Sequence, residues 1–327
     1  MTNEEMKKEW QDFTCPKGDE ADAVSRNVWL LNQLKKPEGI VDAVLDTDTY
    51  NEIDDQYALA YMLKSEEKIR VKAVYAAPFT ATKSTGPADG MEKSWREIRK
   101  VLSLMGREDM YDHVYKGAVS YLPDEKTPAI SDAAKDLAKR AMQYSPEHPL
   151  YVVAIAAITN VASAILINPE IIDRIVLVWL GGNELDWPNN KEFNMYQDIA
   201  GARIVFGCGV PLVQLPCMGV VSSFTVSGPE LEVYLKGQNA LCDYLVEVTE
   251  KEAEACGCVR TWSRPIWDVT AVGWLMGGDL MSDRIEYAPV PEYDDRYSCR
   301  KDGHFYRYVY YINRDNLLTD LVEKLTR

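Results

Sequence analysis

Short apolar runs alternate with longer amphipathic stretches from about residue 40 to the end of the chain. The short runs are nearly continuous in apolar residues, which is typical of strands that are buried on both faces of a parallel sheet. These predicted strands cover residues 40–45, 69–76, 150–155, 175–180 and 211–215. The amphipathic stretches predict helices at residues 53–64, 91–105, 131–143, 160–167, 199–206, 229–254, 269–276 and 314–325.

Strands that alternate with helices in this way indicate βαβ units. We therefore expect an α/β fold, with a single domain over residues 39–327 and a mostly parallel, Rossmann-like central sheet flanked by helices. Residues 1–38 mix charges with apolar side chains and end in a Lys-Pro-Glu-Gly segment, which predicts an N-terminal helical extension packed on the domain. Ligands of such sheets bind beyond the carboxyl ends of the strands, so polar residues there are the first candidates for a site.

Composition narrows the possible partners. The chain has 327 residues, of which 46% are hydrophobic, enough for one large core. Its formal charge of −15 is spread along the sequence without a block of Lys and Arg, so we expect no nucleic-acid partner. No apolar run approaches the ~20 residues of a membrane span, so we expect no membrane partner. Seven irregularly spaced cysteines favour a reducing compartment, and we predict a cytoplasmic protein.

Five carboxylates occur within ten residues directly after the first predicted strand: Asp46, Asp48, Glu52, Asp54 and Asp55. Carboxylates this close repel one another unless they are protonated or share a cation. The ligands are hard oxygens, and the three histidines are widely scattered, so calcium or magnesium is favoured over zinc. The alternative is a solvated acidic loop that caps the following helix.

Three metal-site families can be argued from the same segment, and the first of them fails. Counted from Asp46, an EF-hand would need Gly at position 51 and Glu at position 57, but Asn51 and Tyr57 stand there. The Asp46-Thr47-Asp48-Thr49 run resembles the motif of haloacid-dehalogenase-type phosphatases, although Tyr50 replaces their usual Thr or Val. In that alternative Asp46 is the nucleophile, Asp48 is the acid/base, and magnesium binds beside them.

The segment more closely resembles the signature of the nucleoside hydrolase family, Asp-x-Asp-Pro-Gly-x-Asp-Asp before an Ala-Leu helix. Further family landmarks follow in order: residues 156–162 resemble Gly-Pro-Leu-Thr-Asn-Leu-Ala, residues 180–182 resemble Met-Gly-Gly, residues 192–194 match Glu-Phe-Asn, and residues 267–268 resemble the late Trp-Asp pair. The first loop is two residues longer than the family's. The family's Asn after the second strand, a ribose contact, and its His-Gly-rich segment have no counterpart. The landmarks that are present predict calcium and ribose recognition, whereas the family's pattern for base recognition is incomplete.

The resemblance implies a Ca²⁺-dependent hydrolysis of the N-glycosidic bond of ribonucleosides, in a homodimer or homotetramer. It implies a calcium site made by Asp48, Asp55, the carbonyl of Ile155 and Asp268. Asp48 is then the catalytic base that takes a proton from water, and Asp54 binds the 2′-hydroxyl. Asp46 is expected to support the loop rather than bind the metal.

The resemblance also implies the residues that contact the rest of the substrate. Asn194 is expected to grip the ribose, Phe193 to line the site, and Glu192 with Asn189 or Asn190 to bind the 5′-hydroxyl. Trp267 is expected to stack on the base and to favour purines, because an indole stabilises a flat, protonated purine. A relative that binds calcium and a nucleoside without turnover is the third possibility, since fold alone does not fix function.

Overall fold

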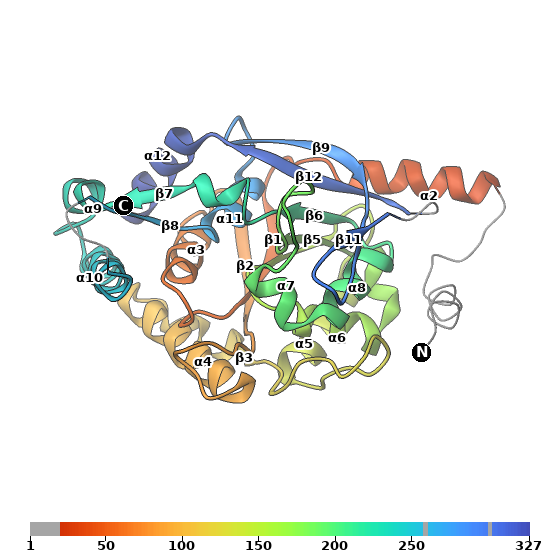
Figure 1. The fold of residues 1–327 in the computed structure, drawn as a ribbon, viewed down its shortest axis with the longest axis horizontal. Helices are drawn as coiled ribbons and strands as arrows, with labels where there is room; N and C mark the ends of the chain where they lie inside the picture. Colours follow the sequence, from red (N-terminus) through yellow and green to blue (C-terminus); the bar gives the residue numbers. More distant parts are fainter. Residues whose placement is uncertain (1–19, 258–260, 300–302) are drawn as a thin grey trace.

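The computed structural model describes residues 20–257, 261–299 and 303–327. Within them, an eight-stranded sheet with the order β3-β2-β1-β4-β5-β6-β12-β9 forms the centre of the molecule (Figure 1). Its strands are β1 (Val41–Thr47), β2 (Ile69–Ala76), β3 (Val114–Lys116), β4 (Leu150–Ala154), β5 (Ile175–Leu180), β6 (Leu212–Leu215), β9 (Met281–Tyr287) and β12 (Phe305–Ile312). All neighbouring strands of this sheet pair in parallel except β9, which runs antiparallel to β12.

The described helices connect these strands or extend from them. They are α2 (Glu20–Gln33), α3 (Asp54–Leu63), α4 (Pro87–Leu104), α5 (Asp132–Arg140), α6 (Thr159–Ile167), α7 (Phe193–Gln197), α8 (Ile199–Gly207), α9 (Gly228–Tyr234), α10 (Ala240–Ala255), α11 (Val269–Met276) and α12 (Arg314–Leu325). Short 3₁₀ turns cover Glu108–His113, Ala141–Gln143, Pro169–Asp173 and Val221–Ser223. Two small antiparallel pairs complete the fold, β7 (Thr225–Ser227) with β8 (Ser263–Pro265) and β10 (Val290–Pro291) with β11 (Tyr297–Ser298).

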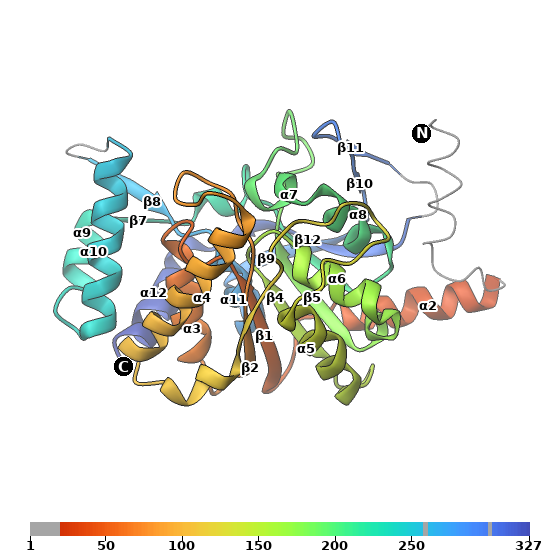
Figure 2. The ribbon, with the colours of Figure 1, turned by 90° about the horizontal axis from the view of Figure 1, so that it is seen from below.

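Helices cover both faces of the sheet (Figure 2). Side chains alternate along each strand, so Ala43 and Leu45 of β1 point to one face and Val44 to the other. The first face packs against α2, α3, α4, α10, α11 and α12, and the second against α5, α6 and α8. The predicted α/β class, with a mostly parallel sheet between helices, is confirmed.

The apolar pattern located the central elements well. β2, β5, α11 and α12 have the predicted bounds. The predicted helix over residues 229–254 is wrong, because it is two helices separated at Gly237, whose φ of +79° is a left-handed conformation that favours glycine. Asn239 then caps α10 by accepting a hydrogen bond from the amide of Cys242 at 2.9 Å.

The pattern missed β3 and the two strands at the other edge of the sheet. β9 carries Asp283, Arg284 and Glu286, and therefore has no continuous apolar run. Edge strands are covered on fewer sides than central ones, which removes the sequence signal that revealed the central strands.

At the N-terminal end, α2 packs on the first face of the sheet through the buried Leu30, and Leu34, directly after the helix, is buried in the same core. Arg26 of this helix forms an ion pair with Asp173. Residues 1–19 of the predicted extension lie outside the described residues. None of the helices in the described residues is both long and apolar enough to cross a membrane.

Candidate active site

A group of acidic residues follows β1, a central strand of the sheet, at its carboxyl end. β1 lies between β2 and β4, and its last residues are Asp46 and Thr47. The chain then forms a tight loop, in which the carbonyl of Asp48 accepts the amides of Tyr50 at 2.7 Å and Asn51 at 2.9 Å. This loop leads directly into α3, whose first turn contains Asp54 and Asp55.

Three carboxylates at the N-terminal ends of two helices meet next to this loop. Oxygen atoms of Asp54, Asp55 and Asp268 all lie within 4.8 Å of one another, and all three residues are buried. Asp268 directly precedes α11, which packs against α3. Its backbone amide donates to Oδ2 of Asp54 at 3.1 Å, which fixes the two segments relative to each other.

Burial and mutual repulsion both disfavour the charged forms of these groups. Burial raises the pKa of Asp54 and of Asp55 to about 7, and neighbouring carboxylates add to the effect. Burial and repulsion from nearby carboxylates raise the pKa of Asp48 and of Asp268 well above the ordinary value. Charges arranged in this way are stable together when a cation lies between them.

The donor set fits a hard divalent cation. Among the described residues, Oδ2 of Asp48 is buried without a hydrogen-bond partner. Thr47 donates its hydroxyl to Oδ1 of Asp55, which holds this carboxylate at the edge of the group. Oxygen-only sites of this kind suit calcium or magnesium rather than zinc.

Asp46 has a different role from its neighbours. It is fully buried, and its Oδ1 accepts a hydrogen bond from Nδ2 of Asn160 at 2.8 Å. Burial raises the pKa of Asp46 to about 7. Asp46 does not line the pocket described next, a position that does not suit the nucleophile of the phosphatase alternative.

A pocket of about 240 Å³ opens above the carboxylates. Most residues predicted for the site line it, namely Asp48, Asp54, Asp55, Ile155, Glu192, Phe193, Asn194, Trp267 and Asp268. The backbone of Ile155 enters from the end of β4, where its amide donates to the carbonyl of Asp46 at 2.9 Å. The structure therefore brings together residues from the ends of several strands.

Glu192 and Asn194 form one wall of the pocket at the start of α7. The carboxylate of Glu192 accepts the backbone amides of Gly182 at 2.8 Å, Asn194 at 2.9 Å and Met195 at 2.9 Å. Glu192 is therefore the N-cap of α7 as well as a pocket residue. Nδ2 of Asn194 donates to the carbonyl of Leu180 at 3.1 Å, which leaves its Oδ1 available to a ligand.

The structure does not place Asn189 and Asn190 in the pocket. Asn189 is exposed, and its Oδ1 accepts the amide of Lys191 at 3.0 Å. Asn190 is buried, and its Oδ1 accepts the amide of Asn183 at 2.9 Å. Both asparagines hold the loop that forms the wall, and neither lines the pocket itself.

Trp267 lines the pocket and is half-buried, and its indole Nε1 has no hydrogen-bond partner among the described residues. Phe193 also lines the pocket and packs edge to face on Tyr196, with ring centroids 5.8 Å apart. Aromatic surface is therefore present in the same pocket as the carboxylates.

Several lining residues had received no site role from the sequence: Asn51, Glu52, Leu180, Asn183, Lys191, Cys217 and Met218. Asn183 follows the end of β5, and Cys217 follows the end of β6. Both residues could have been predicted from the sequence, because polar or reactive residues just beyond the carboxyl end of a parallel strand are candidates for a site. Burial, with repulsion from Asp54, raises the pKa of Glu52 to about 7.

Comparisons with known proteins place this chain in one family. The family model described as inosine-uridine preferring nucleoside hydrolase matches residues 43–301. A pyrimidine-specific ribonucleoside hydrolase of Citrobacter koseri is 24% identical over 258 residues, which cover 70% of this chain and 78% of the relative.

Solved structures with the same fold include a plant nucleoside hydrolase, with a TM-score of 0.68, 18% identity, and coverage of 88% of this chain and 99% of the other. A purine-preferring ribonucleoside hydrolase from Gardnerella vaginalis gives a TM-score of 0.67 at 18% identity, with 87% and 98% covered.

Proposed function

This chain belongs to the family of inosine-uridine preferring nucleoside hydrolases, enzymes that hydrolyse the N-glycosidic bond of nucleosides, and from that premise we propose a calcium-dependent ribonucleoside hydrolase that prefers purine nucleosides. The observation that carries the proposal is the group of buried carboxylates, Asp48, Asp54, Asp55 and Asp268, gathered in one pocket. Such a group is suited to a cation and to the positive charge that develops on a sugar as an N-glycosidic bond breaks.

We assign the calcium ligands to Asp48, Asp55, the carbonyl of Ile155 and Asp268. All four residues line the pocket, and each supplies a hard oxygen. Bound calcium would hold the two ribose hydroxyls and make a neighbouring water more acidic. The assignment differs from the tightest group of carboxylates, Asp54, Asp55 and Asp268, because Oδ2 of Asp54 already accepts the amide of Asp268.

The residues around the cation then have separate roles in binding and hydrolysing the substrate. Asp48, whose Oδ2 has no hydrogen-bond partner among the described residues, takes a proton from the attacking water. The second oxygen of Asp54 binds the 2′-hydroxyl, and Oδ1 of Asn194 binds the ribose beside it. Glu192 faces the 5′ side, where its three backbone donors fix the carboxylate in place.

The preference for purines rests on Trp267. Its half-buried ring lines the pocket and offers a face to a flat leaving base. Stacking and cation–π attraction stabilise a purine that is protonated as it leaves. The relatives leave this choice open, because the Citrobacter koseri protein is named pyrimidine-specific and the Gardnerella vaginalis protein purine-preferring.

A nucleoside panel with and without calcium tests the proposal. Free ribose should appear from inosine, adenosine or guanosine in the presence of calcium, and less of it after chelation. Phosphate release from phosphomonoesters would support the phosphatase alternative instead. Nucleoside binding by calorimetry without any ribose release would show a binding protein.

A further inference from the structure

A short hairpin contacts the loop that leads into the pocket wall with Glu192 and Asn194. β10 and β11 pair antiparallel through Val290 with Ser298 and Pro291 with Tyr297. The turn between them is closed by the amide of Glu292, which donates to the carbonyl of Arg296 at 2.8 Å. A ladder this short is not stable alone in water, so its position depends on contacts with the rest of the chain.

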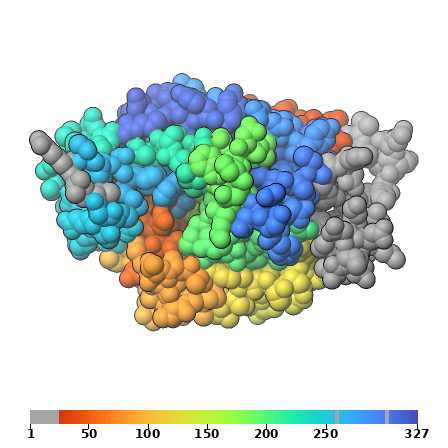
Figure 3. Space-filling view, in the orientation of Figure 1, coloured from red at the N-terminus to blue at the C-terminus, as the bar shows by residue number. Residues whose placement is uncertain are grey.

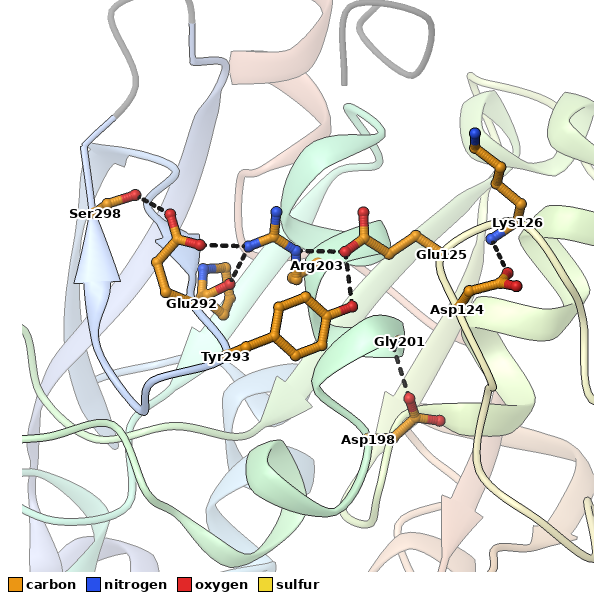
Figure 4. A network of polar contacts seen from close by, with 10 residues as sticks. Asp124, Glu125, Lys126, Asp198, Gly201, Arg203, Glu292, Tyr293 and Ser298 are labelled. Atoms are coloured by element: carbon orange, nitrogen blue, oxygen red, sulfur yellow. Dashed lines mark hydrogen bonds and ion pairs between the residues drawn. The ribbon is translucent and has the colours of Figure 1, made fainter. Parts of the chain in front are cut away.

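Arg203 of α8 supplies the anchor at one side of the hairpin (Figure 4). Its side chain is buried, with 5% exposure. Nη1 donates to the carbonyl of Pro291 at 2.8 Å and to Oε2 of Glu292 at 2.6 Å, while Nε donates to Oε1 of Glu125 at 2.6 Å. A planar guanidinium holds several acceptors in fixed directions, so the hairpin is tied both to α8 and to the loop that contains Glu125.

Two further side chains complete this anchor. The hydroxyl of Tyr293 donates to Oε1 of Glu125 at 2.8 Å, and the hydroxyl of Ser298 donates to Oε1 of Glu292 at 2.5 Å. The guanidinium carbon of Arg203 also lies 5.1 Å from the centre of the Tyr293 ring. Loss of Arg203 would leave two carboxylates without their cation, which is more costly than loss of an exposed ion pair.

The other side of the hairpin holds the pocket loop at residues 183–191. The amide of Asn190 donates to the carbonyl of Asp295 at 2.6 Å, and Nζ of Lys191 lies 3.9 Å from the Asp295 carboxylate. The hydroxyl of Tyr297 accepts Nε2 of Gln214 at 2.7 Å. Tyr297 also contacts Gly182 so closely that a Cβ there would lie 2.2 Å from its hydroxyl.

The loop at residues 183–191 connects the hairpin to the pocket. Asn190 accepts the amide of Asn183 at 2.9 Å, and Asn183 and Lys191 both line the pocket. Lys191 directly precedes Glu192, the cap of α7. In the space-filling view, the green segment around residue 190 lies directly beside the blue hairpin near residue 295 (Figure 3).

We propose that Arg203 is a positioning residue of the active site, which acts through the hairpin Val290–Ser298 to fix the pocket wall formed by residues 183–194. Arg203 itself does not line the pocket. This inference rests on the proposed function, because the wall is the one assigned to the ribose. Its consequence is that loosening a contact outside the pocket weakens substrate binding.

The test replaces Arg203 and a matched arginine elsewhere. Arg203→Met removes both ion pairs, and Arg203→Lys keeps the charge but loses the planar fork. Arg140→Met is the control, because Arg140 forms a part-buried ion pair with Asp136 at 2.8 Å within α5 and does not line the pocket. Steady-state kinetics with the best nucleoside and hydrogen exchange of the amides at 183–191 are measured for each.

For Arg203→Met we expect KM to rise at least about fivefold with a smaller change in kcat, and faster exchange in residues 183–191, in the hairpin and in the loop that contains Glu125. Arg203→Lys should lie between this variant and the wild type, and Arg140→Met should match the wild type in both readouts. If Arg203→Met does not fold, Glu292→Gln tests the contact between Arg203 and the hairpin, because glutamine has nearly the same shape as glutamate but no charge.

Unchanged KM and exchange in a folded Arg203→Met, or the same changes in Arg140→Met, would overturn the proposal. If the wild type releases no ribose from any nucleoside, the proposed function fails. The exchange measurement then still decides whether Arg203 fixes the loop.

Discussion

At the scale of single residues, the site depends on carboxylates that have different partners although they are close in sequence. Oδ1 of Asp46 accepts a hydrogen bond from Asn160 and Asp46 does not line the pocket, whereas Asp48 lines it; among the described residues, Oδ2 of each is buried without a hydrogen-bond partner. Residues of the same type two positions apart are therefore expected to respond differently to substitution.

Asp48→Asn should lower turnover at least about a hundredfold, because it removes both a proton acceptor and a charge from the proposed calcium site. Asp46→Asn should have a milder effect, since Asp46 does not reach the pocket. The measurement is ribose release at saturating calcium. Near-normal turnover by Asp48→Asn would rule out the assigned role as base.

Trp267→Phe and Trp267→Ala should cause a graded loss of activity that is confined mainly to purine nucleosides. The physical reason is the loss of stacking and cation–π attraction, worth roughly 1–2 kcal/mol in a desolvated site. Rates with inosine, adenosine, guanosine, uridine and cytidine are compared for the three proteins. An equal loss for every substrate, or a wild-type preference for uridine, would refute the stacking role.

At the scale of elements, the loop after β1 is held by contacts to α6 rather than by its own turn alone. Asn160, in the first turn of α6, donates Nδ2 to Asp46 at 2.8 Å and accepts the amide of Ala118 on Oδ1 at 2.9 Å. One buried amide thus connects β1, α6 and the segment that follows β3.

Asn160→Leu should lower the free energy of unfolding by about 1–3 kcal/mol, because it leaves Asp46 and the amide of Ala118 buried without partners. Urea denaturation in the absence of calcium measures this loss. Asn316→Ala provides the control, since Asn316 is exposed and its hydrogen bond to Asp279 is at the surface. Equal stability of the two variants would contradict the proposed connection.

At the scale of the whole molecule, the acidic site connects stability to pH and to cation binding. Burial raises the pKa of Asp54, Asp55, Asp46 and Glu192 to about 7, above the ordinary value of a carboxylate. These four carboxyl groups therefore bind more protons in the folded protein than in the unfolded chain between roughly pH 4 and pH 7. In that window their contribution to stability falls as pH rises, and below it these four groups are protonated in both states.

Metal-free protein should accordingly melt at a lower temperature at pH 8 than at pH 5, by roughly 2–4 °C for each kcal/mol lost. Millimolar calcium should raise the melting temperature at pH 8 and reduce the dependence on pH, because it binds the folded carboxylates only. Zinc should not substitute specifically. Differential scanning fluorimetry on metal-free protein measures these melting temperatures. The same melting curve with and without calcium would exclude the calcium site.

The sequence by itself determined the central sheet and the position of the acidic loop. Strands such as β2 and β5 are buried on both faces, so each forms a continuous apolar run whose limits are visible in the sequence. The acidic loop is local, since Asp46, Asp48, Asp54 and Asp55 follow one strand and begin one helix. Properties that depend on neighbours in sequence were therefore predictable.

Only the tertiary structure decided which distant side chains join that loop and which do not. Asp268 reaches Asp54 because α11 packs on α3, whereas Asn189 and Asn190 point to their own loop and to Asn183. The edge strand β9 and the hairpin that Arg203 holds gave no sequence signal, because their positions rest on contacts between residues far apart in the chain. Such contacts form only when the elements pack, which a pattern of neighbouring residues does not encode.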